Sequence, residues 1–158
     1  MKAATVHELK KELKYQSQTE LLELCLRLAK FKKENKELLT YLLYEADNET
    51  SYIASVQEEI NDQFELINTS SYFYIKKSVR KILRMVKKYI RYSKQKETEV
   101  ELLLYFCTKL KSMKPSIKKS LALYNIYKRQ LLFVEKNIDK LHEDLQYDYK
   151  LELQGLME

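Results

Sequence analysis

Hydrophobic positions recur at spacings of three and four residues along almost the whole chain, with polar positions between them. In the segment 50–67, Ile53, Val56 and Ile60 follow this spacing. Such spacing places side chains on one face of an α-helix, because the helix has about 3.6 residues per turn. Interruptions of the pattern divide the chain into seven predicted helices, at about 6–14, 18–31, 34–46, 50–67, 72–93, 97–113 and 116–147.

Residues with known capping behaviour mark several of the predicted helix ends. The segments 5–8 and 17–20 match the capping box, in which a Ser or Thr hydroxyl and a Glu carboxylate satisfy free backbone N–H groups. The polar run 68–71 separates two helices, and Pro115 ends another. The segment 102–107 is apolar on nearly every side, so its helix is predicted to lie buried at the centre of the fold.

The chain of 158 residues contains one glycine and one proline. The turns between β-strands usually need such residues, so we do not expect a fold based on a β-sheet. Gly155 lies close to the C-terminus, so the sequence has no glycine-rich loop that could hold a phosphate. We therefore predict an all-α fold, a single domain of six or seven antiparallel helices in an irregular bundle or a short α-solenoid.

Two leucine-rich segments of similar sequence, 37–42 and 101–106, lie 64 residues apart. Each is followed by a break and then by a long amphipathic helix. Two three-helix halves, at about 5–68 and 70–147, would suit a short solenoid of stacked helices. A chance similarity between two leucine-rich helices explains the same observation.

The formal net charge of +6 is distributed unevenly along the chain. Ten basic residues and no acidic one lie between Leu66 and Lys96, whereas the rest of the chain has 19 basic and 23 acidic residues. In the helix predicted at 72–93, apolar side chains occupy one narrow arc and basic side chains the opposite one. The candidate binding residues of this basic face are Lys77, Arg80, Lys81, Arg84, Lys87, Lys88 and Arg91.

Three interpretations of the basic face are open at this point. It could lie along the phosphates of a nucleic acid, where each contact adds a salt-dependent increment of affinity. It could instead rest on an acidic membrane surface. The third interpretation is a solvated helix face whose charges pair with acidic residues of the preceding helix, such as Glu58, Glu59, Asp62 and Glu65.

The last predicted helix carries a regular apolar seam. Its residues alternate spacings of three and four, which is typical of a helix that packs lengthwise on a neighbour. A helix over 116–147 would be about 48 Å long, and a small domain can bury only part of that length. The candidate oligomer seam consists of Tyr124, Tyr127, Leu131, Val134, Ile138, Leu141 and Leu145.

Residues that usually carry catalysis or bind metals are sparse. The two histidines, His7 and His142, lie at opposite ends of the sequence. Cys25 and Cys107 sit in apolar runs without the spacing of a zinc site, so we interpret both as buried free thiols. We therefore predict no enzymatic activity, no bound metal and no cofactor.

Two resemblances to known families add to this interpretation. The segments 5–14 and 19–28 resemble a SAP-type helix pair, a family that binds DNA, which would nominate Lys10, Lys11 and Lys14. The glycine of that family's connecting turn is absent from this segment. Through the same opening and the segments 79–82 and 101–106, the chain is also similar to small all-helical bacterial domains of unknown function. That second resemblance implies an all-α fold and no particular activity.

The expected function is that of a non-enzymatic interaction or scaffold protein, which binds a protein partner or self-associates through its last helix. The alternative is a nucleic-acid-binding protein that uses the basic helix near 72–93. The N-terminus lacks the apolar segment of a secretory signal, and the longest apolar run is far too short to span a bilayer. We therefore expect a soluble, cytoplasmic protein, and a membrane is not its expected partner.

Overall fold

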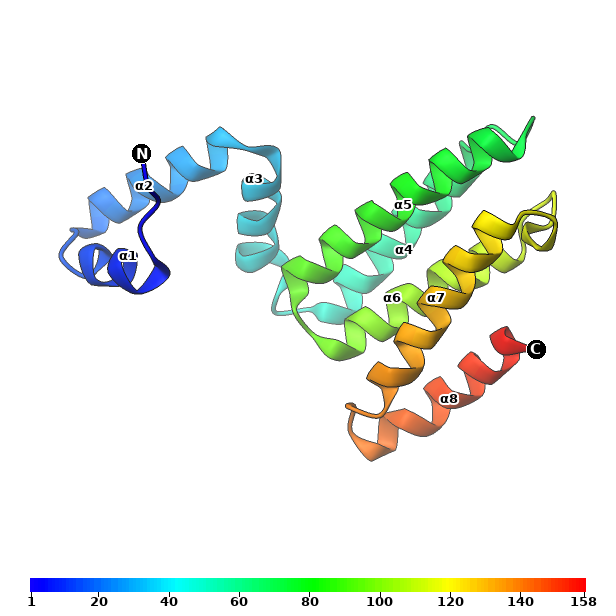
Figure 1. The fold of residues 1–158 in the computed structure, drawn as a ribbon. Helices are drawn as coiled ribbons and strands as arrows, with labels where there is room; N and C mark the ends of the chain where they lie inside the picture. The colour runs from blue at the N-terminus through cyan, green and yellow to red at the C-terminus, as the bar shows by residue number, and fades with distance from the viewer. The chain divides into compact units, whose positions relative to one another are not determined.

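The computed structural model describes residues 1–158, of which 80% are helical, and it contains no strand. The all-α prediction is confirmed, whereas the expected number of six or seven helices is wrong. Eight α-helices follow one another, with a π-helical turn η1 at Tyr41–Glu45 and a 3₁₀ turn η2 at Ile117–Lys119 (Figure 1). They are α1 (Val6–Leu13), α2 (Gln18–Phe31), α3 (Lys33–Thr40), α4 (Glu49–Glu65), α5 (Tyr72–Ser93), α6 (Lys96–Lys111), α7 (Leu121–Ile138) and α8 (Glu143–Met157).

The chain folds into two compact units, Met1–Tyr44 and Glu45–Glu158, which we call the N-terminal and C-terminal units. The two leucine-rich segments of similar sequence lie in different units and in different environments. Leu38 and Leu42 of the first segment are exposed, whereas Leu102, Leu103 and Leu104 of the second are buried. None of the eight helices has the length and apolar character needed to cross a membrane.

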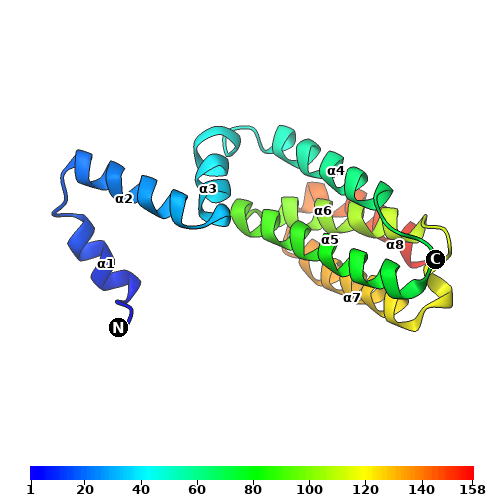
Figure 2. The ribbon, with the colours of Figure 1, turned by 90° about the horizontal axis from the view of Figure 1, so that it is seen from above.

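The C-terminal unit is built around α6. This helix contacts α4, α5, α7 and α8, and in Figure 2 the helices α4 to α7 run side by side. Half of its residues are buried, among them Leu102, Phe106 and Leu110. The central position predicted from the nearly continuous apolar segment 102–107 is therefore confirmed.

Helix α8 is held at its C-terminal end by polar groups of two other helices. The Tyr127 hydroxyl of α7 donates a hydrogen bond to the Leu156 carbonyl, with 2.6 Å between the oxygens. The Lys111 ammonium of α6 donates to the Gly155 carbonyl at 2.9 Å. These bonds satisfy carbonyl groups that a helix end leaves without partners, and Leu153 is buried beside them.

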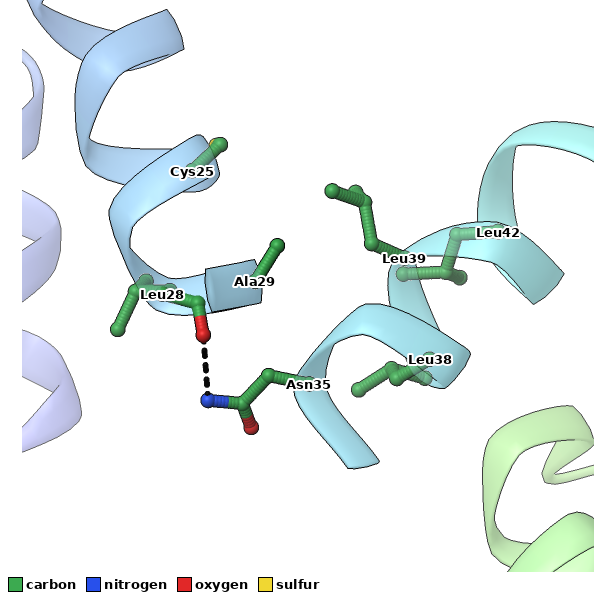
Figure 3. Close-up of a pocket in the computed structure, with 7 residues that line it drawn as sticks. All are labelled: Cys25, Leu28, Ala29, Asn35, Leu38, Leu39 and Leu42. Carbon is green, nitrogen blue, oxygen red and sulfur yellow. Dashed lines mark hydrogen bonds between the residues drawn. The ribbon is translucent and has the colours of Figure 1, made fainter. Parts of the chain in front are cut away.

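The N-terminal unit has capped helices but very little core. The capping boxes expected at Thr5 and Ser17 are both present. Helices α2 and α3 contact each other, and the Asn35 side-chain amide of α3 donates a 2.8 Å hydrogen bond to the Leu28 carbonyl of α2 (Figure 3). Ala29 and Tyr41 are the only buried hydrophobic residues of this unit.

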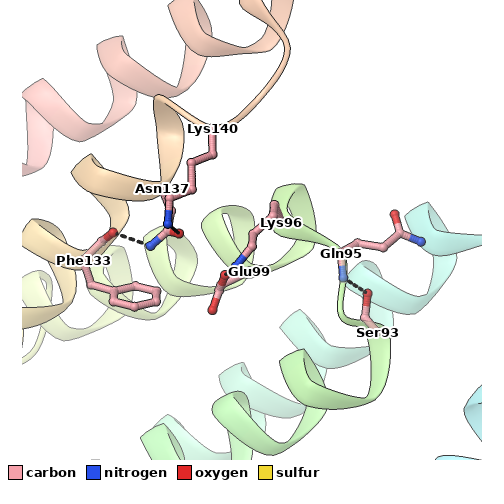
Figure 4. A network of polar contacts seen from close by, with 7 residues as sticks. All are labelled: Ser93, Gln95, Lys96, Glu99, Phe133, Asn137 and Lys140. Carbon is pink, nitrogen blue, oxygen red and sulfur yellow. Dashed lines mark hydrogen bonds and ion pairs between the residues drawn. The ribbon is translucent and has the colours of Figure 1, made fainter.

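The expected helix over 116–147 is wrong, because its first residues form the separate turn η2 and a turn at 139–142 divides the rest between α7 and α8. Near the end of α7, the buried Asn137 donates from its amide to the Phe133 carbonyl at 2.8 Å. Its amide oxygen accepts from the Lys140 ammonium at 3.3 Å (Figure 4). Helices α7 and α8 both pack on α6, so the three-and-four spacing of apolar residues continues across the turn. The apolar pattern therefore does not reveal that the helix is interrupted there.

Candidate functional site

Helix α5 carries the basic face, and its bounds match the predicted 72–93. Its apolar arc is buried inside the C-terminal unit, with Ile75, Val79 and Val86 without any exposed surface. Lys94 caps the end of the helix, with a φ of 59° in the left-handed region and an N–H that donates to the Ile90 carbonyl. Burial of one arc orients the opposite, cationic arc outward along the whole helix.

Six of the seven predicted binding residues are exposed: Lys77, Arg80, Lys81, Arg84, Lys87 and Arg91. Lys88 is half-buried, and its ammonium lies 5.1 Å from the centre of the Tyr89 ring, a cation–π distance. Lys88 therefore has a structural contact within the helix, whereas the six exposed residues present their charge to solvent.

A groove runs between α5 and α7, with a volume of about 440 Å³. Leu83, Ala122 and Ile126 are its apolar lining residues. Four of the remaining lining residues are cationic, namely Arg80, Arg84, Lys87 and Arg129, and the fifth, Asn125, is polar and uncharged. We call this feature the basic groove, and two helices distant in the sequence supply its cations.

Arg129 and Asn125 were not among the residues predicted from the sequence. A signal for them exists, because Ala122, Asn125, Ile126 and Arg129 follow the three-and-four spacing and so share one face of α7. Only the packing of α7 against α5 shows that this face lies beside the basic one.

The four cations of the basic groove form no ion pair within the protein. The ion pairs of the protein include Lys33–Glu37, Lys96–Glu99, His142–Asp144 and Lys150–Asp139. None of the paired residues lines the groove. No acidic residue of α4 forms an ion pair with them, and Glu59 accepts a 2.8 Å hydrogen bond from the Tyr89 hydroxyl. Like charges that share a groove repel one another, and a bound anion relieves that repulsion.

The predicted oligomer seam lies largely inside the C-terminal unit. Tyr127, Leu131, Val134 and Ile138 are buried, and the three other seam residues, Tyr124, Leu141 and Leu145, are half-buried. The turn after Ile138 also ends the continuous helix on which the seam was expected. The periodic seam therefore packs against neighbouring helices of the same unit.

The residues considered for catalysis are not brought together. Both cysteines are free thiols, with Cys25 exposed and Cys107 fully buried, so the expected burial of Cys25 is wrong. Burial raises the pKa of the Cys107 thiol to about 12. His7 and His142 are both exposed, and His142 caps α8 by accepting from the Asp144 N–H at 3.3 Å. No cluster of three or more His, Cys, Asp or Glu side chains has the arrangement of a metal site.

The lysines nominated by the resemblance to SAP-type helix pairs, Lys10, Lys11 and Lys14, are all exposed on or just after α1. Comparisons with known proteins found no matching family model, no matching curated protein and no matching solved structure.

Proposed function

We propose that this protein binds nucleic acid through the basic groove. The observation that carries the proposal is the set of four unpaired cations, which two separate helices hold around one groove. Guanidinium groups suit this task because each presents several N–H donors in a planar fork that matches phosphate oxygens. Arg80, Arg84 and Arg129 are three of the four cations.

The extent of the basic face favours a polymer of phosphates over a single small anion. From Lys77 to Arg91 the exposed cations of α5 extend over about 21 Å of helix. A membrane surface is disfavoured, because a helix that lies on a bilayer turns its apolar face to the lipid. The apolar arc of α5 is already buried in the C-terminal unit.

The test is fluorescence anisotropy with a labelled oligonucleotide of about 20 nucleotides, in single-stranded and duplex form, at about 50 mM and 200 mM salt. We expect binding at the lower salt that weakens steeply at the higher. The double substitution Arg80→Glu/Arg84→Glu should weaken binding at least about tenfold and reduce its salt dependence by about two phosphate contacts.

The matched control is Lys10→Glu/Lys11→Glu, which makes the same change in charge on the exposed surface of α1. This control should leave binding nearly unchanged. If the control abolishes binding and the α5 variant does not, the resemblance to SAP-type pairs identifies the correct surface and the basic groove does not.

A second candidate function, the binding of a protein partner, is favoured by a groove in the N-terminal unit. Its lining between α2 and α3 is almost entirely apolar: Cys25, Leu28, Ala29, Asn35, Leu38, Leu39 and Leu42 (Figure 3). The segment 27–37 around it has five basic and two acidic residues. We propose an acidic amphipathic helix of a partner protein as its occupant, because apolar residues would fill the groove and carboxylates would meet the basic surroundings.

Cys25 allows a direct test of this second proposal. An environment-sensitive fluorophore attached to Cys25 should shift its emission on addition of a leucine–glutamate amphipathic peptide of about 15 residues. A leucine–lysine peptide with the same apolar face is the control and should produce no shift. Equal responses to both peptides, or none to either, would contradict the proposal. A shift that depends on protein concentration without peptide would indicate self-association as the occupant.

A further inference from the structure

Two exposed phenylalanine side chains lie in line with the basic groove. Phe73 precedes Arg80 by seven residues on α5, which is about two turns, so both lie on the same face. Phe133 follows Arg129 by four residues on α7, which is about one turn. The two residues are 65% and 43% exposed, although neighbouring positions on both helices bury apolar side chains.

The two rings belong to opposite ends of the groove. Helix α6 reverses direction between α5 and α7, so α5 and α7 run the same way (Figure 1). Phe73 lies near the beginning of α5, about 10 Å along the axis before Arg80. Phe133 lies about 6 Å beyond Arg129 toward the other end. A strand that follows the groove therefore meets an aromatic ring, then the cations, then a second aromatic ring.

This order of groups matches the chemistry of an unpaired nucleic-acid strand. Cationic side chains follow its phosphates, and exposed aromatic rings stack on its free bases. The Asn125 side-chain amide, which also lines the groove, offers both a donor and an acceptor to the edge of a base.

A duplex fits the same surface poorly. A helix that reads duplex DNA projects into the major groove, whose width of about 12 Å admits a single helix. Helix α5 contacts α4, α6 and α7, so it does not project from the C-terminal unit. The bases of a duplex are also stacked on one another, which leaves no base face for Phe73 or Phe133.

We infer that the basic groove takes single-stranded nucleic acid, with bases stacked on Phe73 and Phe133 at its two ends. This inference rests on the proposed function and names its substrate class. Stacking of a base on an aromatic side chain contributes about 1–3 kcal/mol, so the loss of one ring should weaken binding about five- to 150-fold.

The experiment measures anisotropy of one labelled oligonucleotide of about 20 nucleotides, alone and annealed to its complement, at about 50 mM salt. We expect the single strand to bind at least about tenfold more tightly than the duplex. Phe73→Ala and Phe133→Ala should each weaken single-strand binding and leave the weaker duplex binding unchanged. Tyr147→Ala removes an exposed ring from α8, outside the basic groove, and is the matched control.

A second measurement reports stacking directly. The chain contains no tryptophan, so Phe73→Trp provides a single tryptophan at the proposed stacking position, which can be excited selectively in the presence of the 13 tyrosines. Single-stranded oligonucleotide should quench its emission, and this readout does not depend on whether the alanine variants fold normally.

The possible results distinguish stacking of a single strand on Phe73 and Phe133 from nucleic-acid binding by the basic groove in general. Duplex binding as tight as single-strand binding, with no effect of either alanine variant and no quenching of the tryptophan, overturns the inference and keeps the proposed function. Absence of binding to both forms at the lower salt overturns the proposed function itself.

Discussion

Gly155, the single glycine of the chain, lies inside α8 without a conformational reason for being glycine. Its φ is not positive, and no neighbouring atom lies within 4 Å of the position that a Cβ would occupy. Glycine in a helix is less favourable than alanine by roughly 1 kcal/mol. We expect Gly155→Ala to raise the free energy of unfolding by about 0.5–1 kcal/mol, as measured by urea denaturation.

Gln154→Ala is the control for this prediction, because it changes an exposed neighbour in the same helical turn. Its effect on stability should be smaller than about 0.5 kcal/mol. A loss of stability in Gly155→Ala would contradict the open surroundings of that residue.

The two cysteines differ in reactivity because they differ in burial. Cys25 is exposed, whereas Cys107 is fully buried on α6 with its pKa raised to about 12. The thiolate is the reactive species, so Cys107 should resist a thiol reagent such as DTNB near neutral pH. We expect one thiol to react in the folded protein and two in urea, measured by absorbance.

Cys25→Ser should leave no reactive thiol in the folded protein. Reaction of both thiols under native conditions would mean that α6 does not occupy the centre of the C-terminal unit.

At the scale of elements, the docking of α8 determines how stability depends on alkaline pH. Burial raises the pKa of Tyr127 to about 12, with the neighbouring Cys107 and Tyr124 as smaller causes. Burial, together with the carboxylates of Glu101 and Glu97, also raises the pKa of Tyr149 on α8. An unfolded tyrosine ionises near pH 10, so above that pH the unfolded chain releases protons that the folded chain retains.

The free energy of unfolding should therefore fall between about pH 10 and 12 as the tyrosines of the unfolded chain ionise, and the buried Cys107 thiol, whose pKa is also raised to about 12, adds a fall that begins near pH 9. Tyr127→Phe should reduce that fall. It should also cost about 1 kcal/mol near neutral pH, since the hydrogen bond to the Leu156 carbonyl is lost. Urea denaturation at several pH values measures both effects, and an unchanged pH dependence in the variant would contradict the prediction.

For the whole molecule, the two units differ in how much core they contain. All buried hydrophobic residues except Ala29 and Tyr41 belong to the C-terminal unit. The helices of the N-terminal unit span 8, 14 and 8 residues, and isolated helices shorter than about 12–15 residues are marginal in water. We expect a fragment of residues 45–158 to fold alone and to unfold cooperatively, with circular dichroism as the measurement.

A fragment of residues 1–44 should show much less helix than the same residues have in the structure. It is the companion measurement, and a well-folded fragment 1–44 with a disordered fragment 45–158 would reverse the assignment of the core.

Features that depend on residues within one or two helical turns could be predicted from the amino-acid sequence. The capping boxes at Thr5 and Ser17, the bounds of α5 and its basic face follow from local hydrogen bonding and from the helical period. The central position of α6 was also predictable, because a helix that is apolar on all sides has no face to offer to water.

Which helix faces meet depends on contacts between residues far apart in the chain. Periodicity shows that a helix face is buried but does not show what covers it. The apolar seam was therefore expected to pack on a second molecule, whereas in the structure it packs on other helices of the C-terminal unit. The same limit hid the turn at 139–142, since α7 and α8 both pack on α6. Arg129 joins Arg80 and Arg84 only because α7 packs beside α5, and a contact between residues so distant in the chain leaves no local pattern.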